Sequence, residues 1–299
     1  MTILNHTNEG LPSELIVLTR TIFYSKEIKI DDLISICSPP KNNSNRLRGC
    51  LLRWIKLGLF ERSENDIVKV NAIFTKDKKI LVDEFTNRLP FITQQLALEN
   101  ENAVPLLPTS FDEDDNSGVS ADFVRGVSWL LAQNIYNFPT KWEGVELLQN
   151  SQIGKIISND VRWGSLRRWC RYLGFATGDS SSFQIDPTKA INDQLPFIFA
   201  DKKKLNAHEF LAELCQRLPV LDGGVYRLTV ESRLDIQKWR RPEDDHLSMS
   251  LSLALRRLAL NGTITLVDKA DGIKNIRLTG FDFQSWISFK YVIWNGGSQ

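Results

Sequence analysis

The chain repeats one local pattern three times: an amphipathic helix that carries arginines, a glycine that ends it, and a β-hairpin. The three copies span residues 47–70, 163–185 and 251–278. A glycine just after the last helical residue is typical of a helix C-terminus, because it adopts the left-handed conformation without a steric cost. Helix, glycine and hairpin in this order form the end of a winged-helix domain. The pattern therefore predicts a mainly α-helical α+β chain of tandem winged-helix domains with small β-hairpins.

The spacing of the copies favours separate domains over a regular array. The terminal glycines Gly58, Gly174 and Gly262 lie 116 and then 88 residues apart, whereas stacked repeats keep one short period. The prolines and the acidic run near residues 112–115 are typical of an exposed connection. We expect winged-helix domain 1 with a trailing helix, an acidic linker, winged-helix domain 2, and a diverged winged-helix-like domain 3 with an aromatic C-terminal segment, at residues 1–100, 101–118, 119–200 and 201–299.

Other segments give more local expectations. Residues 76–98 read as a helix interrupted at Leu89-Pro90, and residues 225–230, which are rich in β-branched side chains, read as a strand. Pro242-Glu243-Asp244-Asp245 is typical of the first turn of a helix, where the dipole favours carboxylates, so we expect a long helix over residues 244–261. The aromatic segment 281–294 is expected to pack as β-structure.

Composition limits the class of protein. The 299 residues carry 37 basic and 36 acidic side chains, for a net charge of +1, so any nucleic-acid surface must be a local patch. Four dispersed cysteines form no CxxC pair, and Cys50 and Cys170 lie on the apolar sides of the repeated helices. These features predict reduced thiols and a cytoplasmic protein. The chain has no apolar stretch long enough to span a bilayer, so we expect no membrane partner.

The polar sides of the repeated helices are the candidate functional surfaces. On a helical wheel, the helices of the first two copies have an apolar side and, opposite it, a basic side. The helix of the third copy has only Arg256 and Arg257 on its outer side. In a winged-helix protein that binds DNA, this helix enters the major groove and its arginines reach bases or phosphates. The residues predicted to contact DNA are Arg46, Arg48, Arg53, Lys56, Arg167, Arg168 and Arg171.

A second interpretation of the same residues stays open. Surface helices are commonly charged on the outer side, basic residues near a C-terminus complement the helix dipole, and arginine stems cover tryptophan edges. The first hairpin tip, Ser63–Asp66, is acidic and would repel phosphate. The same faces could therefore be merely solvated or could dock a protein.

The chain shows no arrangement of catalytic residues. His6, His208 and His246 are far apart in sequence, and the charged run 239–246 lacks the acid-x-lysine strand that would complete a nuclease-like site. No phosphate-binding glycine loop, nucleophile elbow or dinucleotide motif is present. We therefore expect a non-enzymatic protein with no metal site and no small-molecule cofactor.

The opening residues 1–23, MTILNHTNEGLPSELIVLTRTIF, and the arrangement of the copies resemble the DpdG proteins of bacterial dpd gene clusters. Those clusters insert 7-deazapurines into DNA and restrict DNA that lacks them. The resemblance implies a part in a DNA modification-restriction system, an anti-phage defence, on its restriction side. It transfers no catalytic residue to this chain.

Two hypotheses of different classes follow. In the first, the chain binds double-stranded DNA as an accessory of a defence complex and contacts other protein subunits. In the second, it is a protein-binding scaffold of a larger ATPase or nuclease complex, similar to the tandem winged-helix partners of SMC-type complexes. A transcriptional regulator has less support, because no ligand-binding or phosphoacceptor domain is visible.

Overall fold

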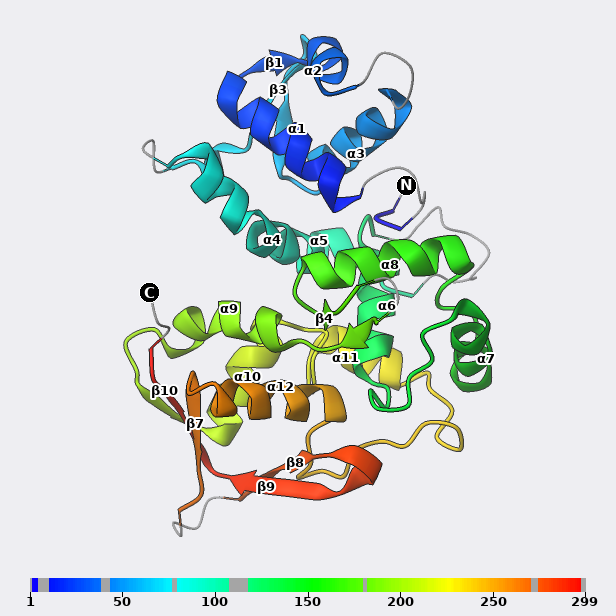
Figure 1. The fold of residues 1–299 in the computed structure, drawn as a ribbon, viewed down its shortest axis with the longest axis vertical. Coiled ribbons are helices and arrows are strands. Elements are labelled where there is room, and N and C mark those ends of the chain that lie inside the picture. The colour runs from blue at the N-terminus through cyan, green and yellow to red at the C-terminus, as the bar shows by residue number, and fades with distance from the viewer. Residues whose placement is uncertain are drawn as a thin grey trace. The chain divides into compact units, whose positions relative to one another are not determined.

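The computed structural model describes residues 2–4, 11–38, 44–76, 80–107, 118–179, 182–269 and 274–296 (Figure 1). The chain divides into two compact units. Unit 1 comprises Met1–Val124 and Ile157–Leu173, and unit 2 comprises Arg125–Ile156 and Gly174–Gln299. In the described part of each unit, helices carry small antiparallel sheets of two or three strands. The predicted α+β class is thus confirmed.

Unit 1 begins with helices around a three-stranded sheet. Its first elements are α1 (Pro12–Ser25), β1 (Ile28–Lys29), α2 (Ile30–Cys37), α3 (Ser44–Lys56), β2 (Phe60–Arg62) and β3 (Ile67–Val70). The sheet order is β1-β3-β2, with Ile28 opposite Val68 and Phe60 opposite Val70. Pro12 starts α1 where a missing N–H is harmless. Gly58, at φ +89°, ends α3 in the left-handed region.

The remaining part of unit 1 joins segments that are distant in sequence. It contains α4 (Val82–Leu98), α5 (Asn100–Ala103), the start of α6 (Ala121–Leu131) and α8 (Asp160–Tyr172). The expected break at Leu89-Pro90 was wrong, because α4 continues through Pro90 to Leu98. Trp54 of α3 and Trp169 of α8 are both buried, with ring centroids 5.5 Å apart. Gln94 Nε2 donates to Leu173 O at 2.6 Å.

Unit 2 holds the end of α6 and the other elements of the chain that the structure describes. In order these are α7 (Trp142–Gln152), β4 (Ala176–Thr177), β5 (Gln184–Ile185), α9 (Thr188–Phe199), β6 (Lys204–Asn206), α10 (Ala207–Arg217), α11 (Val225–Glu231), α12 (Met249–Leu260), β7 (Ile264–Val267), β8 (Ile276–Thr279), β9 (Ser285–Phe289) and β10 (Tyr291–Trp294). Helix α9 packs against α10 and α12 (Figure 1).

The sheet of unit 2 repeats the order of the sheet in unit 1. Strand β10 lies between β6 and β7 and is antiparallel to both, as β3 lies between β1 and β2. In both sheets a helix precedes the first strand (β1 or β6), and at least two helices lie between that strand and the next one (β2 or β7). The strand that comes last in the sequence (β3 or β10) is the central one. The β8–β9 hairpin is an insertion between β7 and β10. The aromatic end of the chain therefore forms part of a sheet, as expected.

The domain boundaries stay a prediction. The predicted limit between residues 200 and 201 separates α9 from the helices on which it packs, and α8 groups with unit 1 while α9 groups with unit 2. Helix α5 (Asn100–Ala103) extends into the predicted linker. The acidic run 112–115 lies outside the described residues.

Two local expectations in unit 2 were wrong. Residues 225–231 form helix α11 instead of a strand, and the buried side chains of Tyr226, Arg227 and Val230 follow the helical spacing. The long helix α12 begins at Met249 and not at residue 244. Ser248 is its N-cap, since the Ser248 hydroxyl oxygen accepts a hydrogen bond from Leu251 N. The same hydroxyl donates a hydrogen bond to Asp222 Oδ1.

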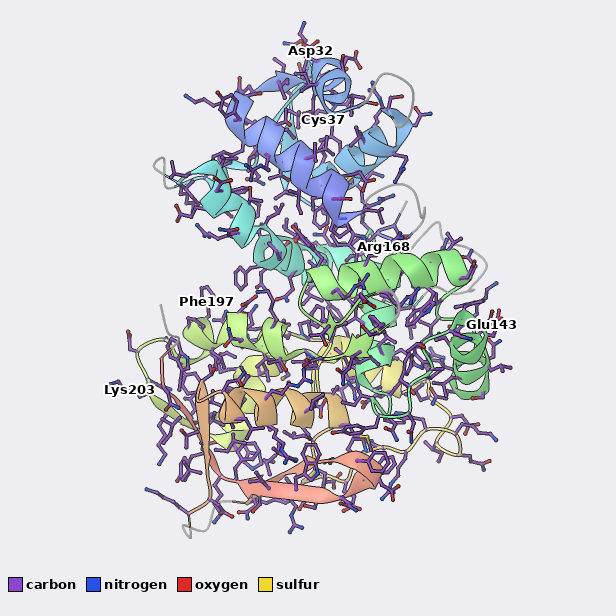
Figure 2. All side chains as sticks on the ribbon, viewed as in Figure 1. Asp32, Cys37, Glu143, Arg168, Phe197 and Lys203 are labelled. Atoms are coloured by element: carbon purple, nitrogen blue, oxygen red, sulfur yellow. The ribbon has the colours of Figure 1, made fainter. Side chains whose placement is uncertain are left out.

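The two cysteines of the repeated helices are buried, as their positions predicted. Burial raises the pKa of the Cys50 thiol to about 12 and also raises the pKa of Cys170. Because the thiolate is the nucleophile, both should resist iodoacetamide at pH 8 in the folded chain and react after unfolding in urea. Half-buried Cys37 (Figure 2) is the internal comparison. Mass spectrometry of the alkylated peptides tests this, and alkylation of Cys50 as fast as Cys37 would contradict it.

Candidate functional site

The basic residues of α3 are mostly engaged within the protein. Arg46 Nη2 lies 2.8 Å from Glu14 Oε1 of α1, and both side chains are largely buried. Arg48 Nη2 lies 2.6 Å from Asp31 Oδ1 of α2 in a more exposed pair. Lys56 is exposed. The acidic residues of α1 and α2 therefore reduce the positive charge that α3 can offer to a ligand.

The helical wheel placed Arg53 on the outer side of α3, but the structure places it on the buried side. Its side chain is only 1% exposed. Helix α3 packs against both α1 and α2, so the buried side is wider than one apolar stripe and also includes Gly49. When the copies are aligned on their terminal glycines, Arg53 occupies the position of Trp169, a core residue. This alignment could have revealed the burial of Arg53 from the sequence.

Helix α8 has a different charge environment. Three of its four arginines, Arg167, Arg168 and Arg171, lie within about one turn of the helix and are here called the α8 arginine cluster. The Arg167 guanidinium stands 5.3 Å from the centroid of the Trp163 ring. Its pKa is lowered first by partial burial and then by the positive charges of Arg171 and Arg168. Arg168 is exposed (Figure 2), and no residue in the described ranges forms an ion pair with it.

The basic surface is therefore not repeated from copy to copy. Alignment on Gly58 and Gly174 places Arg168 and Arg171 at the positions of Leu52 and Ile55. The positive positions of α8 thus correspond to apolar positions of α3, and the two helices cannot present the same contacts to a ligand.

The arginines of α12 take part in internal contacts. Arg256 lies over the Trp286 ring, 4.2 Å from its centroid. Arg257 pairs with Asp186, whose carboxylate is buried and also accepts from Thr188. The third copy therefore contributes less to an outer basic surface than its sequence suggested.

The charged segment before α12 is a loop instead of the first turn of a helix. Its backbone is held by β8: Arg277 N donates to Asp245 O at 2.8 Å, and Leu247 N donates to Arg277 O at 2.9 Å. His246 stands opposite Arg277 in a parallel bridge. The helix start was predicted too early because Ser248, and not Pro242, provides the cap.

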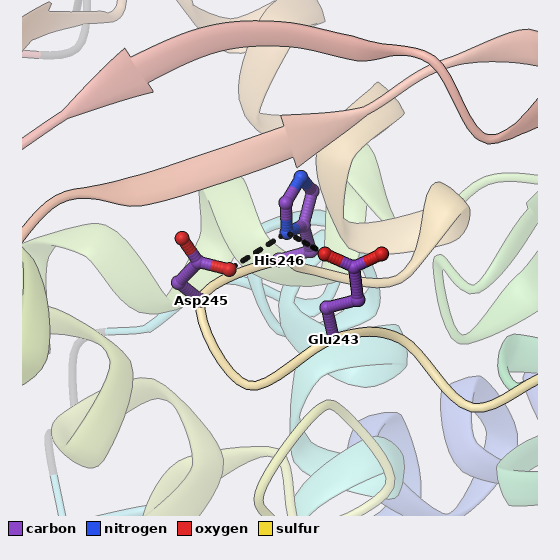
Figure 3. A group of neighbouring side chains, drawn as sticks. All are labelled: Glu243, Asp245 and His246. Atoms are coloured by element: carbon purple, nitrogen blue, oxygen red, sulfur yellow. Dashed lines mark hydrogen bonds and ion pairs between the residues drawn. The ribbon is translucent and has the colours of Figure 1, made fainter.

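This loop brings Glu243, Asp245 and His246 together as a carboxylate–histidine cluster (Figure 3). His246 Nδ1 lies 2.8 Å from Asp245 Oδ1 and 3.7 Å from Glu243 Oε2. Asp245 Oδ2 lies 3.4 Å from Arg277 Nε. The pKa of Asp245 is lowered, mainly by its hydrogen bond with His246 and further by Arg277. Sequence reasoning considered the charged run 239–246 but dismissed it as the start of a helix, and so did not bring these three side chains together.

Two pockets of unit 2 border this cluster. The first, of about 290 Å³, is lined by Glu243 and His246 together with Trp239, Thr279 and Phe283. The second, of about 380 Å³, is lined by the whole cluster with His208 of α10 and with Arg227 and Glu231 of α11. The loop therefore separates two hollows and exposes polar atoms to both.

Comparison with known proteins gives one relationship. Neither a curated protein nor a solved structure matches the chain. Within the residues that the structure describes, none of the helices combines the length and the apolar character needed to cross a membrane. The DpdG-like family matches residues 1–272, nearly the whole chain. The protein therefore belongs to the DpdG-like family.

Proposed function

We propose that this protein binds double-stranded DNA through the α8 arginine cluster, as a non-enzymatic cytoplasmic component of a dpd-type restriction complex. Membership of the DpdG-like family gives it a role in the dpd system of DNA modification. The proposal adds two points to this role: DNA binding and participation in anti-phage restriction. They are supported by the charge of α8 and by its position before a β-hairpin.

The observation that carries the proposal is the exposure of Arg168 on α8, with Arg167 and Arg171 beside it on the same helix. Partial burial and the positive charges of Arg171 and Arg168 lower the pKa of Arg167, so the three guanidinium groups lie close enough to act together on a polyanion. A DNA phosphate placed there would release counterions. Helix α3 presents less positive charge to DNA, because Arg46 and Arg48 already have carboxylate partners.

The topology supports the same proposal. The strand orders β1-β3-β2 and β6-β10-β7 are consistent with winged-helix domains, in which the helix before the hairpin enters the major groove. Helix α8 is followed along the chain by β4 and β5, which pair as a hairpin. From this order of elements along the chain, and not from the two three-stranded sheets, we assign α8 the role of the groove-binding helix in the second copy.

Replacing all three members of the α8 arginine cluster with alanine tests the proposal. Each phosphate that an arginine neutralises contributes about 0.9 to the slope of log affinity against log salt, so the slope should fall by about 2.7. Fluorescence anisotropy with a labelled duplex at several salt concentrations measures this. A charge-matched control replaces Arg20, Arg62 and Lys189, which are exposed but ion-paired, and should change the slope little.

The outcomes separate the hypotheses. Absence of binding by the parent protein, or an equal loss in the cluster variant and the control, would reject the α8 interface. Circular dichroism and thermal melting must show that both variants are folded, because Arg167 also packs on Trp163.

The scaffold hypothesis is favoured by one specific observation, the neutralisation of α3. Ion pairs with Glu14 and Asp31 make this helix less suited to DNA, and the exposed Tyr24 and Ile36 of α1 and α2 lie in the same unit. Co-purification with the product of a neighbouring gene would support it. A monodisperse monomer that binds DNA by itself would count against it.

A further inference from the structure

The carboxylate–histidine cluster combines the donor types that transition-metal ions use. One imidazole nitrogen and two carboxylate oxygens lie within 4.8 Å of one another (Figure 3). A metal ion that lies about 2.0–2.2 Å from each donor holds its ligands roughly 3 Å apart. The observed separations of 2.8 and 3.7 Å from His246 Nδ1 span this value. Only Glu243 must approach, and its side chain is 70% exposed and can change rotamer.

The backbone of the cluster is fixed before any ion binds. Strand β8 bonds both sides of His246, through Asp245 O and Leu247 N, and His246 N donates to Glu243 O at 2.9 Å. Arg277 Nε faces Asp245 Oδ2 at 3.4 Å, so Asp245 Oδ1 stays directed toward His246. Neighbouring groups that orient a ligand carboxylate in this way are typical of protein metal sites.

An independent observation points to a ligand beside the cluster. Glu243 and His246 line the 290 Å³ pocket, and Thr279 lines it too. Thr279 is 6% exposed, and no described residue hydrogen-bonds its Oγ1. A buried hydroxyl without a partner is unfavourable, whereas water or a ligand atom held in this pocket would satisfy it. An ion at the cluster would have three protein ligands and open positions toward this space.

We infer that Glu243, Asp245 and His246 bind one divalent first-row transition-metal ion, with Zn²⁺ as the representative species. The imidazole ligand favours such ions over Mg²⁺ and Ca²⁺, which take oxygen ligands. The inference is independent of DNA binding, since it rests on unit 2 alone and the α8 arginine cluster belongs to unit 1.

Calorimetric titration of the EDTA-dialysed full-length chain with ZnCl₂ tests the site. The parent should bind one Zn²⁺ per chain, and His246→Ala and Asp245→Asn should bind at least about tenfold more weakly, since losing even a ligand's hydrogen-bond partner costs about 10- to 100-fold. Asp244→Asn and His208→Ala are matched controls, because both residues are exposed and lie outside the cluster. Both controls should bind like the parent.

Three outcomes would overturn the inference: no saturable Zn²⁺ binding by the parent, unchanged affinity in His246→Ala, or equal weakening in the two controls. Titration with MgCl₂ distinguishes a general acidic surface, which would bind Mg²⁺ as tightly and would not depend on His246. The d–d absorption of bound Co²⁺ should change in His246→Ala if the imidazole is a ligand. Thermal melting in EDTA confirms that each variant is folded, and unchanged DNA affinity of His246→Ala keeps the two proposals separate.

Discussion

Arg53→Ala is expected to lower the free energy of unfolding by about 2–5 kcal/mol, because truncation of a long, buried side chain leaves a cavity in the core. Arg53 is 1% exposed and lies on the side of α3 that packs in unit 1. Its charge also acts on the thiol of Cys50, whose pKa it partly lowers. Lys56→Ala, three residues further on the same helix but exposed, should change stability by less than about 0.5 kcal/mol. Urea denaturation followed by circular dichroism measures both values.

The pair of variants also tests the role of Arg53 in DNA binding. If Arg53 is a core residue, DNA affinity per folded molecule should be the same in Arg53→Ala and in the parent under conditions where both are folded. A stable Arg53→Ala variant that loses DNA affinity would instead indicate that Arg53 lies on the outer surface, where the helical wheel placed it.

Trp169→Ala should destabilise the chain by about 3–5 kcal/mol, because truncation of a buried aromatic side chain loses its transfer free energy and leaves a cavity. Trp169 is 1% exposed, contacts Trp54 at 5.5 Å between centroids, and meets the Tyr172 ring edge-to-face at 5.7 Å. Tyr24→Ala is the comparison, since Tyr24 is an aromatic residue of the same unit but 85% exposed. Its removal should have little effect.

A double-mutant cycle with Trp54→Ala measures the contact that joins α3 and α8. Aromatic pairs contribute about 0.5–1.5 kcal/mol beyond the area that they bury, and residues in contact show non-additive effects of this size. Strictly additive losses, or a loss below about 1 kcal/mol in Trp169→Ala, would contradict the packing of these two helices in one core.

Much of the local structure could be predicted because its causes are local. Gly58, Gly174 and Gly262 all have positive φ and end the helices that the pattern predicted. The burial of Cys50 and Cys170 follows from helical periodicity alone. The same kind of reasoning placed a strand at residues 225–230, since β-branched side chains favour strands, but packing of α11 overrode that weak preference.

The candidate sites were less predictable, because they depend on residues that are distant in sequence. Helix α12 could have begun at residue 244 by its composition, yet Asp222 fixes Ser248 as the cap and β8 holds the preceding loop extended. The carboxylate–histidine cluster exists only as a result of this extended loop. Had residues 243–246 formed the first turn of a helix, their sequence spacing alone would not have indicated such a cluster.

The sequence by itself determined the presence of the three repeated helices, their terminal glycines, the α+β class and the arginines on those helices, since propensity and periodicity act over a few residues. Only the tertiary structure decided which arginines are available to a ligand. Glu14 and Asp31 neutralise two of them, the packing of α3 on α1 and α2 buries Arg53, and α8 leaves Arg168 exposed. Burial and charge pairing depend on neighbours that the fold brings together, and no local pattern encodes them.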